Sequence, residues 1–298
     1  MTRSSSIVAL GAALLFGGCT QERALHPLGA ESAPSAAVII EPARSASLNA
    51  APSSIPAPSA TPQSAPVAPF RQNLSGKSVA LEVPDFSPAL VRFPARSDKA
   101  PILVVTHGAG GTTEAHCDLW SRITHSSAIL LCVRGRARSP VPSDGEYYPD
   151  HPTLERETFA ALAALRQKFA GQIADGPAYY AGFSQGATMG ALMLVEHASE
   201  ITRLVLVEGG FADWNVARAR DFRARGGERV LFVCGRKECA APAKNAAEWF
   251  THAGVSARVE YIPGAGHTHD GPVEARVAAA YPWLVEGDAR WQAAGAAP

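Results

Sequence analysis

The sequence lacks an excess of charge of either sign, because its 27 Lys and Arg residues equal its 27 Asp and Glu residues. The arginines are also scattered along the chain rather than gathered into one stripe. A protein without a basic field has little attraction for a phosphate backbone, so we exclude nucleic acid as a partner. The sequence contains no internal repeat either, which excludes a solenoid or a propeller.

The N-terminal apolar run is short. It covers residues 7–16, whereas a helix needs about 20 apolar residues to cross a bilayer. A basic residue, Arg3, precedes the run, and small residues follow it, which is the layout of an export signal. We therefore predict a cleaved signal peptide and no membrane-spanning helix at this end of the chain.

The end of this segment, Gly17-Gly18-Cys19, resembles the lipobox of bacterial lipoproteins, in which the cysteine becomes the lipidated first residue of the mature chain. The resemblance implies a signal peptide over residues 1–19 and a membrane anchor at Cys19. Thr20, rather than an aspartate, follows the cysteine, and this order resembles that of lipoproteins sent to the outer membrane. Phe16 departs from the usual leucine, so ordinary cleavage and a periplasmic or secreted protein remain the alternative.

Aromatic residues and charges are scarce between residues 20 and 70, where Ala, Pro and Ser dominate. Such a segment cannot bury enough apolar surface to order itself, so we predict a disordered linker over 20–70. Its proline content favours an extended chain that holds the following domain away from the membrane. We expect that domain over residues 71–286 and a loose C-terminal tail over 287–298.

The chain has only five cysteines, an odd number. With Cys19 assigned to lipid, Cys117, Cys132, Cys234 and Cys239 are enough for two disulfides in an oxidising compartment. More than one pairing is possible, and their order along the chain favours Cys117 with Cys132 and Cys234 with Cys239. Buried free thiols are the alternative.

Apolar runs alternate with helical stretches from residue 77 onward. Continuous apolar strands indicate burial on both faces, and their alternation with helices predicts an α/β fold with a mostly parallel sheet covered by helices on both faces. Two further runs, 78–83 and 90–93, predict a preceding antiparallel pair. The expected parallel strands are 102–105, 128–133, 178–180, 204–207, 230–233 and 257–262. The expected helices are 113–124, 153–170, 185–197, 216–225, 243–253 and 272–285.

A Gly-x-Ser-x-Gly motif, Gly182-Phe-Ser184-Gln185-Gly186, lies between an expected strand and an expected helix. A serine on so tight a turn needs strained backbone angles, and glycines on either side remove the Cβ atoms that would obstruct it. We therefore predict Ser184 as a nucleophile. The backbone amide of Gln185, at the helix start, can donate to an oxyanion. A plain glycine-bordered turn is the structural alternative.

Together with His107-Gly108-Ala109-Gly-Gly after an earlier strand, this motif resembles the α/β-hydrolase superfamily over residues 77–285. The Gly-Phe-Ser-Gln-Gly spelling is similar to carboxylesterases and acyl-thioesterases. The resemblance implies an α/β-hydrolase fold and assigns the second oxyanion amide to Ala109. A run of glycines lets such amides approach a substrate oxygen. We expect His107 to brace this loop rather than act as a base.

The resemblance places the catalytic base after the last strand, where His267 stands. Histidine is the side chain that titrates near neutrality without perturbation, so it can take the Ser184 proton and return it to the leaving group. His269 is the rival base. A metal site of His267, His269 and Asp270 is a third possibility, although it lacks the spacing of common zinc motifs. We predict no metal and no organic cofactor.

The acid of the triad departs from the family's pattern. The family usually has an aspartate three residues after a glycine that ends the penultimate strand, and here Glu238 follows Gly235 at that spacing. Glutamate can orient the imidazole as aspartate does, so we predict Glu238 as the acid, with Cys234 and Cys239 bracketing its loop. Glu208, after the preceding strand, is the alternative, and Asp213 is a weaker one.

The chain has no long insertion that would form a large lid, which favours a fairly open site. The loop 134–151 emerges where ligands bind in open α/β sheets. Its Arg134, Arg136 and Arg138 could meet an acidic group of the substrate, or they could simply be solvated; Tyr147 and Tyr148 belong to the same loop. The sequence thus predicts a monomeric serine hydrolase that cleaves small-molecule esters or other acyl compounds through an acyl-enzyme. A peptidase or amidase with the same triad, or an inactive binding lipoprotein, remains open.

Overall fold

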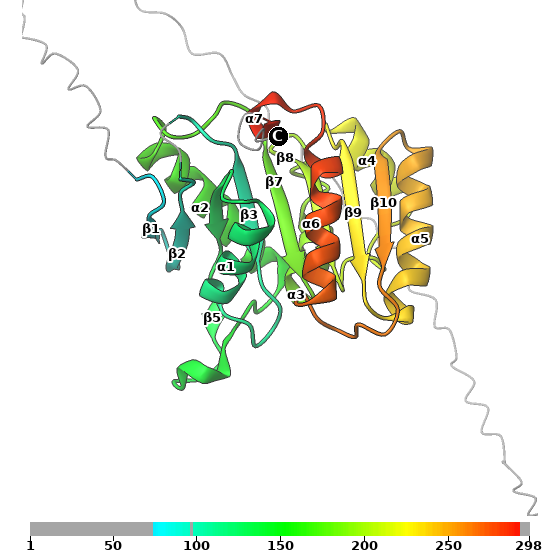
Figure 1. Ribbon diagram of the computed structural model, residues 1–298, viewed down its shortest axis with the longest axis horizontal. Helices are drawn as coiled ribbons and strands as arrows, with labels where there is room; N and C mark the ends of the chain where they lie inside the picture. Colours follow the sequence, from blue (N-terminus) through cyan, green and yellow to red (C-terminus); the bar gives the residue numbers. More distant parts are fainter. Residues whose placement is uncertain (1–73, 96–97, 293–298) are drawn as a thin grey trace, which may run out of the picture. The chain divides into compact units, whose positions relative to one another are not determined.

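The computed structural model describes residues 74–95 and 98–292. The predicted signal peptide, Cys19 and the linker 20–70 lie outside these residues. Strands and helices alternate along the described chain (Figure 1). The strands are β1 Ser78–Val83, β2 Phe86–Arg92, β3 Ile102–Thr106, β4 Ile129–Cys132, β5 Arg136–Ala137, β6 Glu146–Tyr147, β7 Ala178–Phe183, β8 Ile201–Val207, β9 Arg229–Cys234 and β10 Ser256–Tyr261. The helices are α1 Thr113–Ile123, the 3₁₀ turn η1 Pro142–Asp144, α2 His151–Lys168, α3 Gln185–Met193, α4 Val216–Ala224, α5 Lys237–His252, α6 Pro272–Val285 and α7 Ala289–Gln292.

Eight strands form one sheet in the order β1-β2-β4-β3-β7-β8-β9-β10. The pairs β1/β2 and β2/β4 are antiparallel, and every pair from β4 to β10 is parallel. This confirms the predicted mostly parallel sheet with an antiparallel pair at one edge. The second strand of that pair begins at Phe86, four residues before the expected start at 90.

The two faces of the sheet carry separate apolar cores. Side chains alternate between the faces along a strand, so Val104 belongs to the core that includes residues of α2 to α5, whereas its neighbour Val105 belongs to the core that includes residues of α1, α6 and α7. Figure 1 shows α1 and α6 in front of the sheet. Because both faces are covered, β3 and β8 are buried along their whole length, as the apolar runs 102–105 and 204–207 predicted, and β8 also buries Thr202 and Arg203.

Neighbouring parallel strands end at the same level. Phe183, the last residue of β7, pairs with Val207, the last of β8, and Val207 pairs with Val233 near the end of β9. The residues that follow these strands are therefore brought to one edge of the sheet. They are Ser184, Glu208 and Gly235.

The end of the chain differs from the expected loose tail through residue 292. Residues 289–292 form α7, and Trp291 is buried and stacks on Tyr179 of β7 with the ring centroids 4.7 Å apart. Tyr179 also donates a hydrogen bond to Asp288. A large aromatic ring buries enough apolar area to hold a short segment against the sheet, which the polar and small residues around it concealed in the sequence.

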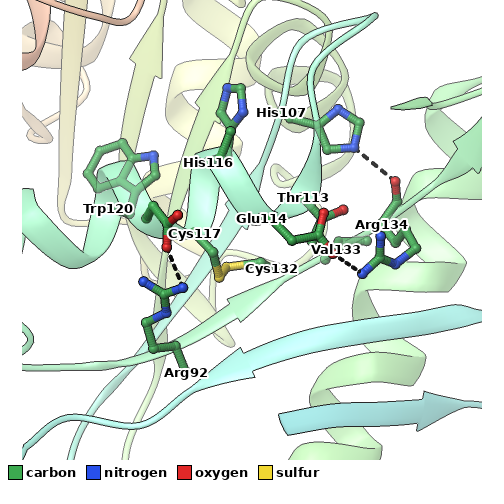
Figure 2. Close-up of a disulfide and its surroundings, with 12 residues drawn as sticks. Arg92, His107, Thr113, Glu114, His116, Cys117, Trp120, Cys132, Val133 and Arg134 are labelled. Carbon is green, nitrogen blue, oxygen red and sulfur yellow. Dashed lines mark hydrogen bonds and ion pairs between the residues drawn. A yellow bond between two sulfur atoms is a disulfide. The ribbon is translucent and has the colours of Figure 1, made fainter. Parts of the chain in front are cut away.

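Both predicted disulfides are present. Cys117–Cys132 joins α1 to the end of β4, with 5.9 Å between the Cα atoms, and lies beside Trp120 and Arg92 (Figure 2). Cys234–Cys239 joins the end of β9 to the first turn of α5. No helix among the described residues is long and apolar enough to span a membrane.

We expect the double variant C117A/C132A to lose about 3 kcal/mol of unfolding free energy, because it opens a loop of 15 residues in the unfolded chain. Equilibrium urea unfolding of the variant and the wild type measures the difference. In reducing buffer the unfolding free energies of the two proteins should become similar, because reduction of the disulfide opens the same loop in the wild type. Equal unfolding free energies in oxidising buffer would contradict a stabilising role for this disulfide.

Candidate active site

Ser184 lies on a strained turn between β7 and α3. Its backbone angles are φ 49° and ψ −108°, in a region that residues with a Cβ atom rarely occupy. A Cβ on Gly182 would stand 2.7 Å from the amide of Ala187, and one on Gly186 would stand 2.5 Å from the hydroxyl of Thr106. Both glycines of the motif are therefore required by close packing. The turn lifts the serine hydroxyl above the edge of the sheet.

His267 contacts Ser184 from the loop between β10 and α6. Its Nε2 lies 2.8 Å from the serine Oγ, and its Nδ1 lies 3.0 Å from Oε2 of Glu208. A carboxylate only accepts hydrogen bonds, so Nδ1 carries the proton, and the unprotonated Nε2 accepts from the serine hydroxyl. The sequence-predicted nucleophile and base thus meet in the geometry that proton transfer requires.

The rival histidine, His269, points elsewhere. Its ring packs on His116, with the centroids 4.2 Å apart, and on Phe183 at 4.5 Å. Burial lowers the pKa of His269 and also lowers that of His116, to about 3, so both rings favour the neutral form. His269 therefore supports the loop that carries His267. It does not hydrogen-bond to Ser184 in the described part of the chain.

Glu208, and not the predicted Glu238, is the carboxylate beside His267. Glu238 lies in the first turn of α5, is exposed, and belongs to a helix that begins at Lys237, six residues before the expected start at 243. An acidic residue there is stabilised by the helix dipole, which accounts for its position without a catalytic role. The prediction of Glu238 as the acid is corrected by this placement. Asp213, the weaker alternative, hydrogen-bonds to neither His267 nor Ser184 within the described residues.

The path of the chain explains why Glu208, and not Glu238, reaches His267. Glu208 directly follows β8, which lies next to β7 and its Ser184. The loop after β10 crosses the end of β9, where the amide of Gly266 donates to the carbonyl of Gly235, and so carries His267 back to β8. The signal in the sequence was an ionisable residue directly after the apolar run 204–207. Only the strand order shows that this end lies within reach of both partners.

The carboxylate of Glu208 is fully buried and amply hydrogen-bonded. Its Oε1 accepts from the backbone amides of Gly235 and Arg236, and its Oε2 accepts from Arg236 Nε at 2.7 Å as well as from His267. Burial opposes the charged form, yet the hydrogen bonds from Arg236, Gly235 and His267 outweigh it and hold the pKa of Glu208 below its usual value. The carboxylate of Glu208 is therefore ionised at neutral pH.

Two backbone amides remain free to bind an oxyanion. Within the described residues, the amides of Ala109 and Gln185 donate to no protein acceptor, whereas Gly110 and Gly111 use theirs to hold the loop. Gln185 is the first residue of α3, where amides have no acceptor inside the helix. Both predicted donors thus have the free N–H group that the role demands.

His107 braces the loop of residues 107–111 after β3, which carries Ala109 and is called the oxyanion loop below. It is 1% exposed, its Nε2 lies 2.8 Å from the carbonyl oxygen of Arg134 (Figure 2), and its ring stacks on Tyr148. The side chain of Gln185 adds a clamp that the sequence did not reveal, since its amide group exchanges two hydrogen bonds with the backbone of Tyr148. The loop 134–151 is therefore fixed to both the oxyanion loop and the helix that follows the serine.

The three arginines of the loop 134–151 differ in their contacts and exposure. Arg134 forms ion pairs with Glu114 and Glu146 and donates a hydrogen bond to the carbonyl of Pro88, so its guanidinium is already engaged by the protein. Arg136 and Arg138 are exposed on the hairpin of β5 and β6. Of the three, only these two fit the predicted contact with an acidic group.

Comparisons with known proteins give a likeness in structure alone. No family model matches the chain, and no curated protein matches it. The protein TT1662 from Thermus thermophilus superposes with a TM-score of 0.54 at 16% identity, covering 70% of this chain and 98% of that one. A dienelactone hydrolase from Anabaena variabilis gives a TM-score of 0.53 at 15% identity, covering 70% and 95%. A dienelactone hydrolase-like promiscuous phosphotriesterase, P91, from metagenomic libraries gives a TM-score of 0.52 at 20% identity, covering 70% of this chain and 96% of that one.

The assignment of the acid has a direct test. We expect Glu208→Gln to lower kcat/KM for an ester substrate by roughly 10³- to 10⁴-fold, because the amide cannot hold the imidazole as the proton acceptor that Ser184 needs. Glu238→Gln, on an exposed helix turn, should change it by no more than about twofold. Steady-state kinetics of the two variants decide between the residues, and the opposite ranking would return the acid to Glu238.

The sheet order, the helices on both faces and these structural neighbours agree with one another, and the chain has the α/β-hydrolase fold.

Proposed function

We propose that this protein is a serine hydrolase that cleaves carboxylic esters through Ser184, His267 and Glu208. The observation that carries the proposal is the continuous chain of contacts from the serine Oγ to His267 at 2.8 Å and from His267 to the buried carboxylate at 3.0 Å. The strained backbone of Ser184 supports it, because such strain persists where function requires it. The hydrolases among the structural neighbours are consistent with it.

The reaction follows from the positions of the side chains. Ser184 Oγ attacks the ester carbonyl while His267 Nε2 takes its proton, and Glu208 stabilises the imidazolium that forms. The amides of Ala109 and Gln185 receive the negative charge of the tetrahedral intermediate. His267 then gives the proton to the leaving alcohol, and an acyl-enzyme remains on Ser184. Water, deprotonated by His267, releases the acid and restores the serine.

The openness of the site favours a small ester or the accessible end of a larger acyl compound as substrate. The side chain of His267 is 39% exposed, and Ser184 is partly exposed. A substrate can therefore reach the serine without a large rearrangement. The same machinery can cleave an amide, and we favour esters because an alcohol is the better leaving group.

Labelling by a fluorophosphonate probe tests the nucleophile and the base. We expect the full-length protein to be labelled and Ser184→Ala and His267→Ala to remain unlabelled, since the probe reacts with an activated serine. Ser199→Ala, which removes an exposed serine just before β8, at the edge of the sheet opposite Ser184, is the matched control and should label as the wild type does. A panel of chromogenic esters and amides then defines the preference. A folded wild-type protein that resists the probe would favour the inactive binding lipoprotein instead.

We also propose that the chain is exported and lipidated at Cys19. The two disulfides of the folded part support an oxidising compartment, where such bonds persist. The lipidated chain would be held at the membrane, the outer membrane being favoured by Thr20, with the catalytic domain on the linker.

Cell fractionation with radiolabelled fatty acid tests this proposal in a bacterial host. We expect the wild type in the membrane fraction with incorporated label, and Cys19→Ser in the soluble fraction without it, because a lipid anchor supplies the membrane affinity. A wild type that is cleaved, soluble and free of label would support ordinary signal cleavage.

A further inference from the structure

Arg236 shares an acceptor atom with the catalytic base. The guanidinium Nε of Arg236 and the imidazole Nδ1 of His267 both bind Oε2 of Glu208, at 2.7 and 3.0 Å. The residue is not needed to complete a nucleophile, a base and an acid. Its charge nevertheless lies at the same oxygen atom as the ring that must accept a proton.

The local sequence position of Arg236 is unfavourable. It is the N-cap residue of α5, where Ser, Thr, Asp or Asn is preferred, and it makes no side-chain capping bond. A cation at this end also opposes the helix dipole. Departures from local preference that the rest of the structure maintains are found where function demands them, so the position itself indicates a role outside the helix.

The backbone around Arg236 is held firmly enough to aim its side chain. Gly235 and Arg236 donate both backbone amides to Oε1 of Glu208, and the disulfide of Cys234 with Cys239 closes the short loop that contains them. The arginine thus contacts the carboxylate through its backbone and through its side chain. Two of these contacts need only a peptide bond, whereas the contact with Oε2 needs this side chain.

The charges of the group show what the arginine changes. Before reaction, Glu208 and Arg236 form a neutral pair beside a neutral imidazole. When His267 takes a proton, a second cation stands at the same carboxylate oxygen. The positive charge of Arg236 opposes that proton uptake, and its hydrogen bond competes with the one from His267.

We propose that Arg236 is a positioning residue that keeps His267 in its free-base form at lower pH, and so extends the activity of the enzyme toward acid. This inference rests on the proposed function. It assigns to Arg236, whose side chain is 41% exposed, a task that a purely structural counter-ion for a buried carboxylate would not have.

The polar and ionisable groups around His267 come from several elements. Ser184 faces it from the start of α3, Glu208 from the end of β8 and Arg236 from the end of β9. His269 interacts with it on its own loop, and Asp270, Glu274 and Arg122 act on His269 in turn. Arg236 is the cation that binds the carboxylate of the triad. Its removal is therefore expected to change proton uptake by His267 more than the removal of a more distant charge.

The pH dependence of kcat/KM tests the proposal in the full-length protein. We expect Arg236→Gln to move the acidic limb of the profile upward by roughly half to one pH unit, the effect of one partly exposed charge close to an ionisable group. Arg236→Met, which keeps the aliphatic stem, should move it in the same direction, and Arg236→Lys, which keeps the charge, should move it less. A limb that stays in place or moves to lower pH in both neutral variants would overturn the proposal.

A matched control is an arginine of α6 that pairs with a buried glutamate of β10, the strand next to β9. Arg276 pairs with the buried Glu260 of β10 at 2.9 Å, so Arg276→Gln also removes a partly exposed arginine from a buried glutamate. We expect its pH profile to match the wild type, because Glu260 does not contact His267. Circular dichroism of each variant shows that the fold is kept.

An NMR titration separates this proposal from the proposed function. If the wild type shows no turnover that depends on Ser184, the proposed hydrolase function is refuted. The imidazole of His267 can still be followed by NMR in ¹³C-labelled protein, and the variant His267→Gln assigns its signal. We expect the imidazole of His267 to take up its proton at higher pH in Arg236→Gln than in the wild type. Proton uptake by His267 at the same or a lower pH in Arg236→Gln than in the wild type would overturn the role of Arg236, whether or not the protein is an enzyme.

Discussion

The site depends on one buried charge, the carboxylate of Glu208. A buried carboxylate without partners would be neutralised or would destabilise the fold, so its neighbours must supply hydrogen bonds and positive charge. The ends of β9 and β10 bring those partners, namely two backbone amides, a guanidinium and the imidazole. The level ends of the parallel strands are what allow segments so far apart in sequence to meet there.

The same carboxylate connects the disulfide framework to the site. Cys234–Cys239 closes the turn that carries the amides of Gly235 and Arg236, so one covalent bond restrains two donors to Glu208. Cys117–Cys132 joins α1 to the end of β4 and stabilises the packing of that helix against the strand. The two disulfides therefore stabilise different parts of the molecule, one near the acid and one near the helix that follows the oxyanion loop.

The sequence predicted most of the fold because buried parallel strands contain continuous apolar runs, and it predicted the strained turn at Ser184 because the glycine spacing has a steric cause. It did not determine the acid. Glu208 and Glu238 both follow strand ends, and the choice depends on whether residues 237–239 form a loop or a helix turn. The clamp of Gln185 on Tyr148 was also hidden, since it joins residues far apart through a hairpin whose strands are too short to show a period.

Three successive strand ends carry a residue that its local backbone disfavours. Ser184 and Glu208 have positive φ angles of 49° and 53°, and Arg236 occupies a helix N-cap. Each costs free energy locally, and each is held by contacts with the others or with His267. A sheet selected for stability alone would place glycine or asparagine at the first two positions and a capping residue at the third. Their coincidence at one edge of the sheet is therefore the strongest physical argument that this edge is built for chemistry.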